Sequence, residues 1–325
     1  SFLNGASHPE EMISQASELG LSALAVTDHN GVYGAVRFAR AASDSGLKSI
    51  IGMELTLAGG YHITLLARDR AGYANMCRLA TKAHRCSSGR KPTLPFEDLS
   101  GYTTGLVALS GCCRGEIPAA ALKGDLDHAA KLTADYSALF EPGCFFLELY
   151  NHLQEEDLVT GNALITVAAR TGVSVVATNN AHYHHPGRSR LQDVLTCIKH
   201  TETLDTIGSK LLPNSEFCLK SPAAMASLFS GSPEAIQNTL HIADMCSFDL
   251  SSKLEYGLPT ATIPAGYTEF TYIEKLVWDS VRVRYEPLTD KVCKRVSKEL
   301  AYIRKHDLAG YFLTAREIIQ FCNTN

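Results

Sequence analysis

The sequence has no run of apolar residues near the roughly 18 that a membrane-spanning helix requires, and its first residues lack the basic and apolar zones of a signal peptide. We therefore expect a soluble, cytoplasmic protein without a membrane partner. The chain has no initiator Met and stops directly after an apolar helical pattern. We expect both ends to be cuts in a longer protein.

Two common nucleotide-binding signatures are also missing. There is no GxxxxGK[ST] loop and no GxGxxG motif after a strand pattern, which disfavours a P-loop ATPase and a dinucleotide-dependent enzyme. The net charge of −4 argues against nucleic-acid binding over the whole surface, because contact with phosphates needs a basic face. The cysteines include no CxxC pair, so we expect most of them to be reduced and buried.

From residue 9 to about 185, short β-rich apolar runs alternate with amphipathic helical patterns. The pattern predicts strands over 23–27, 50–52, 61–67, 106–109, 145–149 and 173–177. It predicts helices over 35–43, 73–85, 126–139 and 157–171. A further helix, ending near Leu19, would be opened by a capping box of Ser7 and Glu10. This alternation predicts an α/β fold built on a parallel sheet or barrel.

Beyond about residue 187, helical patterns dominate. Pro222 and Pro233 each stand early in a predicted helix, where their missing N–H costs nothing. Later helices are predicted over 270–284, 288–306 and 311–322, after a segment rich in helix breakers at 256–266. The sequence thus predicts a mainly helical region after the α/β region.

Histidine and glutamate side chains follow several predicted strands. His29 follows the first strand, Glu54 the second, and His152 and His182 follow two later ones. The carboxyl ends of parallel strands open onto one face, so these groups would converge there, and imidazoles with a carboxylate make a metal site. His62 stands near the start of its strand, so it joins the group only if that strand runs the other way or the barrel is irregular.

Structural roles stay open for all of these residues. A single His after a strand is more often a surface or capping residue than a metal ligand. Asp28 could cap the next helix through its side-chain oxygen. Asp125 and Asp127 have the spacing of paired metal carboxylates, but they lie in a polar loop that opens a helix, where acidic residues favour the helix dipole.

Other candidate groups carry less weight. His184 and His185 lie in the turn before Pro186, so we favour His182 alone as an inward-facing ligand from this tract. Cys112 and Cys113, which follow Ser110, have no convincing His partner in the sequence, and inert packing is the simpler interpretation. Lys291, Lys294, Arg295 and Lys298 share a predicted helix, and a solvated face explains them better than a phosphate track.

A long ordered series of motifs resembles one family. The PHP domain of bacterial DNA polymerase III alpha subunits is similar to residues 2–7 (FLNGAS), 24–35 (LAVTDHNGVYGA), 51–54 (IGME) and 61–67 (YHITLLA). The same series continues in order at 177–183 (ATNNAHY), 212–216 (LPNSE), 246–250 (CSFDL) and 310–314 (GYFLT). It spans nearly the whole chain. The LPNSE and CSFDL stretches look most like the error-prone, damage-induced branch of these C-family polymerases.

The resemblance implies three regions. An irregular (β/α) PHP barrel would occupy 1–186, without its first strand and its HxH motif, which would precede Ser1. A helical connector would follow over 187–265, and the truncated start of the polymerase palm over 266–325.

The resemblance also implies a divalent metal, Zn²⁺, Mn²⁺ or Mg²⁺, in the PHP domain. The positions that match the family's ligands are His29, Glu54, His62, His152 and His182. Asn4 and Asn180 stand at two further ligand positions where relatives carry Asp, and an amide lacks the charge that helps to hold clustered cations. We therefore expect fewer bound metals and weak or absent nuclease activity, with the domain mainly structural.

For the whole protein, the resemblance implies an error-prone DNA-directed DNA polymerase that acts in translesion synthesis and damage-induced mutagenesis. Its catalytic carboxylates and their Mg²⁺ would lie beyond Asn325. Its partners would be a DNA primer-template, deoxynucleoside triphosphates, a sliding clamp and mutasome accessory proteins. Two alternatives stay open: a replicative alpha subunit whose PHP domain proofreads as an exonuclease, and a free-standing PHP phosphoesterase similar to histidinol phosphatase. The helical region from 187 to 325 counts against the phosphoesterase.

Overall fold

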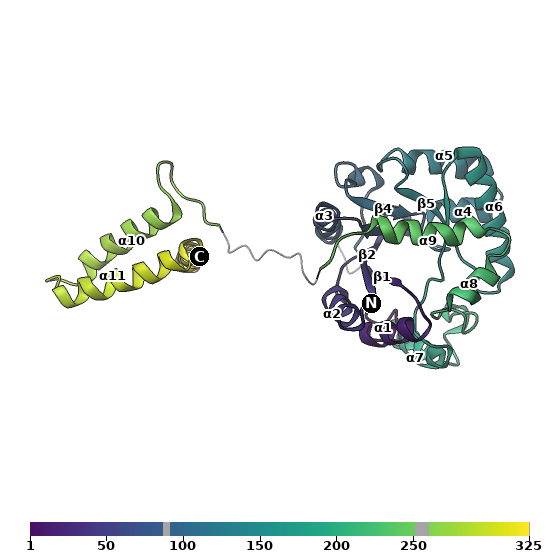
Figure 1. Ribbon diagram of the computed structural model, residues 1–325, viewed down its shortest axis with the longest axis horizontal. Helices are drawn as coiled ribbons and strands as arrows, with labels where there is room; N and C mark the ends of the chain where they lie inside the picture. The colour runs from purple at the N-terminus through teal and green to yellow at the C-terminus, as the bar shows by residue number, and fades with distance from the viewer. Residues whose placement is uncertain (87–91, 251–259, 325) are drawn as a thin grey trace. The chain divides into compact units, whose positions relative to one another are not determined.

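The computed structural model describes residues 1–86, 92–250 and 260–324 (Figure 1). The chain divides into two compact units, Ser1–Leu254 and Glu255–Asn325. The first unit is α/β and the second is helical, so the predicted fold class is confirmed. In the described part of the chain, no helix is long and apolar enough to cross a membrane.

The strands of the described residues form one sheet, which curls into a half-barrel (Figure 1). They are β1 (Ala23–His29), β2 (Lys48–Thr56), β3 (His62–Ala67), β4 (Leu106–Leu109), β5 (Phe145–Leu149) and β6 (Val175–Ala177), in that spatial order. Strands β1 and β2 are parallel, β3 is antiparallel to both of its neighbours, and β4, β5 and β6 are parallel. All six were predicted, with differences of a few residues at their ends.

The sheet is mixed, where the alternating pattern predicted a parallel one. Strands β2 and β3 are joined by residues 57–61 alone, which include Gly59 and Gly60 at positive φ. A parallel pair needs a crossover of a dozen or more residues, so this short connection can only make an antiparallel hairpin. The reversed direction of β3 satisfies the condition under which His62 joins the predicted group.

Helices surround the sheet. In the first unit they are α1 (Pro9–Glu18), α2 (Ala35–Ser45), α3 (Arg70–Cys86), α4 (Glu116–Leu122), α5 (Leu126–Ser137), α6 (Glu155–Thr171), α7 (Ser189–His200), α8 (Pro222–Leu228) and α9 (Pro233–Met245). Short 3-10 turns lie at Ala58–Gly60, Phe96–Leu99, Pro186–Arg188 and Gly208–Lys210. Helix α4 was not predicted, because it is short and contains Pro118.

The predicted capping box of α1 is wrong by one residue. His8 is the N-cap, and its amide donates to the carboxylate of Glu11 at 2.8 Å. The hydroxyl of Ser7 instead lies 2.7 Å from Nδ1 of His184, and it accepts the amide N–H of the same residue. The Ser7 side chain, which the local pattern assigned to the cap, therefore makes a tertiary contact with His184 instead.

The two faces of the sheet bury different residues. Ile51, Met53, Leu65 and Leu147 lie in the large core under the surrounding helices. Because side chains alternate along a strand, their neighbours point to the opposite, concave face. Its apolar part comprises Ile50, Leu66, Val107, Leu109, Phe146 and Val176, and it packs against Ile242 and Ala243 of α9 and against Cys246, the residue that follows this helix. Helix α9 crosses the strands in Figure 1. The polar residues of the concave face lie farther along the same strands.

The second unit contains α10 (Glu269–Arg284), α11 (Asp290–Lys305) and α12 (Ala309–Thr324), close to the predicted ranges. Its small core is formed by Ile273, Ala309 and Leu313. The four basic residues of α11 that were assigned to a solvated face are all exposed. Part of the predicted connector, residues 251–259, lies outside the described residues. The predicted domain limits at 186 and 265 stay predictions.

Candidate metal centre

The register of the sheet brings three predicted ligands to one rim of the half-barrel. His29, the last residue of β1, is the register partner of Glu54 on β2. Glu54 in turn faces Thr64 on β3, and His62 faces Thr56. Residues 54 and 56, like 62 and 64, share a face of their strand. The side chains of His29, Glu54 and His62 therefore meet on the concave face.

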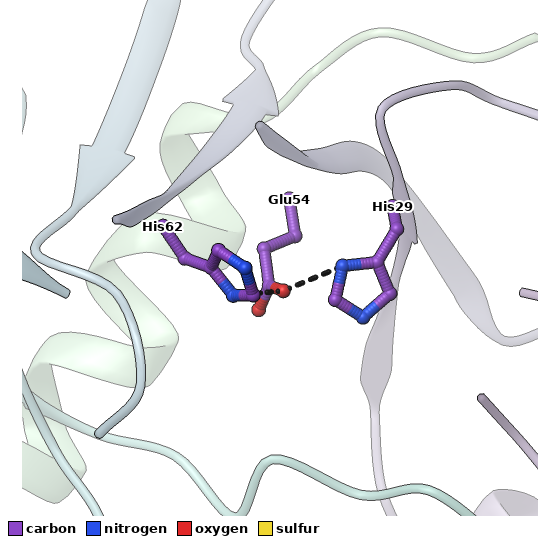
Figure 2. A group of neighbouring side chains, drawn as sticks. All are labelled: His29, Glu54 and His62. Atoms are coloured by element: carbon purple, nitrogen blue, oxygen red, sulfur yellow. Dashed lines mark ion pairs between the residues drawn. The ribbon is translucent and has the colours of Figure 1, made fainter. Parts of the chain in front are cut away.

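Figure 2 shows the two imidazoles on either side of the carboxylate. Nδ1 of His29 lies 2.7 Å from Oε1 of Glu54, and Nδ1 of His62 lies 2.6 Å from the same oxygen. The two rings stand edge to face with centroids 5.4 Å apart. Among the described residues, this is the one group of three or more His, Cys, Asp and Glu side chains whose ligand atoms all lie within 4.8 Å of one another.

The electrostatics of the group favour a charged glutamate. Burial alone would raise the pKa of Glu54, but the contacts with His29 and His62 outweigh it and hold that pKa well below its usual range. Oε1 is buried, and in the described structure no donor meets hydrogen-bond geometry at it, although both Nδ1 atoms are close. Two nitrogens and a carboxylate oxygen that converge without mutual hydrogen bonds are a donor set that Zn²⁺ or Mn²⁺ can use.

A fourth donor, which the sequence analysis assigned to inert packing, lies beside this group. Sγ of the buried Cys112 is 3.9 Å from Nδ1 of His62. The preceding Gly111 has φ +87°, and a Cβ there would stand 2.3 Å from the carbonyl oxygen of His62. Only glycine lets the cysteine loop approach β3 so closely. The sequence signal that could have found Cys112 is this glycine directly before the cysteine pair.

The two thiols of the loop differ in their surroundings. The hydrogen bond with Cys113, together with burial, raises the pKa of Cys112. The same hydrogen bond, helped by the nearby Arg114, lowers the pKa of the exposed Cys113 to about 7. Cys112 would thus bind a metal only by losing a proton that the metal-free loop retains.

His152 is buried in the same unit, but its ring atoms contact other groups. Nε2 lies 2.9 Å from the backbone oxygen of Asn179, and Nδ1 lies 3.6 Å from Oδ2 of Asp157. The ring stacks on Phe217 with a centroid distance of 3.8 Å. The structure therefore does not bring His152 into the group of three.

His182 shares a ring contact with His152, since both imidazoles meet Phe217. Its ring meets Phe217 edge to face at 5.9 Å, and Nδ1 lies 2.5 Å from the backbone oxygen of Asn4. Burial lowers the pKa of His182, against the effect of the Asn4 carbonyl, so the imidazole is neutral at physiological pH. One ring nitrogen contacts the carbonyl, and the neutral ring suits a metal ligand.

Both predicted Asn substitutions line the same cavity as the group of three. This cavity of about 510 Å³ is also lined by His29, Glu54 and His182. The side-chain oxygen of Asn4 accepts a hydrogen bond from the ammonium of Lys199. Asn180 adopts a left-handed backbone conformation with φ +41°, directly after Asn179, whose side chain donates to the backbone oxygen of Glu216 at 2.9 Å.

Glu148 is a buried acid that the sequence analysis missed. It lies on the concave face of β5 and lines the cavity. Oε1 accepts the hydroxyl of Thr178 at 2.7 Å, while Oε2 is buried and has no hydrogen-bond partner among the described residues. Burial raises the pKa of Glu148 to about 7, although the Thr178 hydroxyl opposes this. The available signal was a glutamate within the apolar run FFLEL.

The capping interpretations of the acidic residues are confirmed. Oδ2 of Asp28 accepts the amide of Gly34, the N-cap residue of α2, at 2.7 Å. Asp125 is the N-cap of α5 and accepts the amide of His128 at 3.1 Å. Asp127 is exposed and pairs with Arg170 at 3.0 Å.

Two regions of the chain match known domain families. Residues 1–152 match the PHP domain, and residues 271–325 match the bacterial DNA polymerase III alpha NTPase domain. The first match contains His29, Glu54, His62 and Cys112. The second contains most of α10 and all of α11 and α12.

Curated relatives match along nearly the whole chain. The error-prone DNA polymerase of Symbiobacterium thermophilum is 38% identical over 339 residues, which cover 99% of this chain and 31% of the relative. The error-prone DNA polymerase of Mycobacterium tuberculosis is 35% identical over 339 residues, which cover 100% of this chain and 31% of the relative. The DNA polymerase III subunit alpha of Treponema pallidum is 33% identical over 334 residues, which cover 98% of this chain and 28% of the relative.

The chain thus spans about a third of the length of these relatives. The order of its matched regions, a PHP domain before a polymerase III alpha region, is the order that the sequence motifs indicated. The chain thus combines a match to the PHP domain with a match to the start of a DNA polymerase III alpha region, and it is similar to error-prone DNA polymerases along nearly its full length.

Proposed function

We propose that the whole protein is an error-prone DNA-directed DNA polymerase that acts in translesion synthesis and damage-induced mutagenesis. The observation that carries this proposal is the match of 99% of the chain to a relative of that name, at 38% identity. The polymerase carboxylates and their Mg²⁺ would lie beyond residue 325. DNA primer-template and deoxynucleoside triphosphates would be the substrates, and a sliding clamp and mutasome accessory proteins the partners.

Primer extension tests this proposal. The full-length protein should add deoxynucleotides opposite a template lesion in the presence of Mg²⁺, and with lower fidelity than a replicative alpha subunit assayed beside it. Accurate extension that stops at the lesion would favour the replicative alternative. Failure to extend any primed template would contradict both.

For the PHP domain, we propose a divalent metal held by His29, Glu54 and His62. Cys112 lies close enough to His62 to join them, and His182 faces the same cavity. A bound divalent ion would hold a phosphate oxygen and lower the pKa of a water molecule beside it. His152 remains a candidate ligand only if its ring leaves its contacts with Asn179 and Asp157.

We propose that this centre mainly stabilises the domain. The group ties β1, β2 and β3 together at their rim, where two imidazoles and a buried carboxylate meet. Asn4 and Asn180 supply neutral amides at positions where a nuclease would use carboxylates, so less negative charge is available to hold clustered cations. A free-standing phosphoesterase is disfavoured by α10–α12, which match a polymerase region.

The preceding segment of the whole protein would complete the half-barrel. Among the described residues, β1 pairs only with β2 and β6 only with β5, and residues of both edge strands line the cavity. The hydroxyl of Ser1 accepts the amide of His29 at 2.8 Å, so Ser1 lies beside the carboxyl end of β1. A strand placed before Ser1 could therefore run between β1 and β6 and bring the HxH motif to the metal centre.

A further inference from the structure

Helix α3 buries one face and carries positive charge on another. Met76, Leu79 and Ala83 lie in the large core, at the spacing of one face of a helix. The helix contains no Asp or Glu along its 17 residues, although the whole chain has a net charge of −4. Arg78 and Arg85 are exposed. Positive charge is therefore concentrated on the outer side of α3.

A groove of about 630 Å³ lies on this side of the helix. Its cations, Arg78, Lys82 and Arg85, are four and three residues apart, so they follow one another along the same face. An aromatic ring, that of Tyr102, comes from the loop before β4. The remaining lining residues are Cys77, Thr81 and Cys86. The groove thus combines a row of cations with one ring.

The guanidinium of Arg78 is held in place by a neutral group. Its Nη1 donates to Oδ1 of Asn75 at 2.8 Å, and Nδ2 of the buried Asn75 donates to the backbone oxygen of Thr104 at 3.0 Å. In the part of the chain that the structure describes, no carboxylate pairs with Arg78 or Arg85. The charges of these two residues are therefore available to an anion.

Lys82 and Tyr102 are also held by their surroundings. Nζ of Lys82 lies 2.9 Å from Oδ1 of Asp98 and 5.7 Å from the centroid of the Tyr102 ring. Tyr102 packs against the large core, which fixes its ring. Asp98 can balance one of the three cations that line the groove, so two positive charges remain.

The basic residues of α11 form a different kind of surface. That helix also contains Asp290 and Glu299, and Nε of Arg295 lies 4.0 Å from Oε1 of Glu299. Carboxylates are thus mixed with the cations of α11, as on an ordinary solvated face, whereas α3 has none.

We propose that the α3 groove binds single-stranded DNA: Arg78 and Arg85 contact its phosphates, and a base lies against Tyr102. A positively charged groove with an aromatic ring is the combination by which proteins hold a single strand without reading its sequence. Guanidinium groups suit phosphate oxygens, because their donors form a planar fork. The choice of DNA among polyanions rests on the proposed function, since a polymerase works on a single-stranded template.

Cys86 gives a local measure of binding, because its exposed thiol lines the groove. The full-length protein is treated with iodoacetamide, with and without an oligothymidylate of about 12 nucleotides, a length within the range that one such site covers. Mass spectrometry follows the alkylation of each cysteine. Bound DNA should slow the alkylation of Cys86 several-fold. Cys113, exposed in the loop after β4, is the internal control and should react at an unchanged rate.

Variants of the lining residues test their roles. Arg78→Gln and Arg85→Gln should each raise the DNA concentration needed for half protection about fivefold, the effect of one exposed charge contact. The double variant should lose most of the protection. Tyr102→Leu keeps an apolar side chain against the core and should also weaken protection about fivefold, through one lost stacking contact. Lys131→Gln removes an exposed cation of α5 and should protect Cys86 as the wild type does.

The possible failures are separate. If the full-length protein extends primed templates but the oligonucleotide leaves Cys86 as reactive as before, this inference alone is overturned. The same holds if Lys131→Gln loses as much protection as the arginine variants. If polyglutamate protects Cys86 as well as DNA does at the same ionic strength, the groove takes an acidic protein segment and the DNA proposal is wrong. If the protein neither extends primers nor binds the oligonucleotide, the proposed function fails as well.

Discussion

Glu54 and His62 lie on neighbouring antiparallel strands, and Oε1 of the first is 2.6 Å from Nδ1 of the second. Glu54 stands near the end of β2, whereas His62 begins β3. The short hairpin between these strands places the start of β3 beside the end of β2. His29 then joins them, because β1 runs parallel to β2 and ends opposite Glu54.

Loss of either imidazole should therefore disrupt metal binding. We expect His29→Ala and His62→Ala each to lower the affinity for Zn²⁺ by at least about tenfold, since one of three converging donors is gone. The gain in melting temperature on adding Zn²⁺ should shrink accordingly. His128→Ala removes an exposed imidazole at the start of α5 and serves as the control. Equal Zn²⁺ affinities in all three variants would show that the metal binds elsewhere.

His152 should behave as a packing residue. Its stacking on Phe217 and its contact with Asn179 are lost in His152→Ala, so we expect unfolding to become easier by about 2 to 4 kcal/mol. Zn²⁺ affinity should change by less than about threefold, because the ring nitrogens face other groups. Denaturant unfolding and a Zn²⁺ titration of the same variant measure the two effects. A loss of Zn²⁺ affinity as large as that of His62→Ala would make His152 a ligand.

Glu148 should make stability depend on pH. Its pKa rises from about 4.5 in the unfolded chain to about 7 in the fold, because burial disfavours the charged carboxylate. The folded state thus holds a proton that the unfolded state has released, so this contribution is complete below pH 4.5 and is lost as pH rises through 7. The contribution of Glu148 to the free energy of unfolding amounts to at most about 3 kcal/mol.

The Glu148→Gln variant isolates this contribution. A neutral amide cannot ionise, so the free energy of unfolding of the wild type relative to the variant should fall between pH 5 and pH 8. Urea unfolding at several pH values measures it. A constant difference across this range would mean that Glu148 is ionised in the fold.

Asp125 should contribute to stability alone. Asp125→Ala removes the side chain that accepts the amide of His128 at the start of α5, and we expect a loss of about 1 kcal/mol. Asp125→Ser should recover most of it, since serine also caps helices. Zn²⁺ content should stay the same in both variants. A drop in Zn²⁺ content would revive the interpretation of Asp125 and Asp127 as metal carboxylates.

The strands and most helices follow from local patterns, and so could be predicted. Local patterns do not predict the direction in which a strand runs in the sheet. His62 could be placed in the site only conditionally, because its position depends on the hairpin at residues 57–61 and on the register between β2 and β3. A tertiary contact also decides the cap of α1. The Ser7 side chain contacts His184, and His8 is the N-cap in place of Ser7.

The sequence predicts those site residues whose place next to a predicted strand can be read from the sequence alone. His29 and Glu54 could be found because they directly follow the apolar cores of predicted strands, at 23–27 and 50–52. Cys112 and Glu148 could not, because a cysteine in a loop and a glutamate in an apolar strand are marked only by what surrounds them in three dimensions. The contact between Lys199 and Asn4 joins residues almost two hundred positions apart, and no spacing rule predicts it.

We propose that the centre of His29, Glu54 and His62 binds metal for stability and not for proofreading. The most direct test is to remove metal from the full-length protein with a chelator, follow its melting temperature, and assay the Mn²⁺-loaded protein on primers with a mismatched 3′ end. We predict a melting temperature lowered by several degrees without metal, and excision no faster than in His29→Ala. Rapid excision of the mismatch that His29→Ala abolishes would show that the metal centre is a proofreading nuclease.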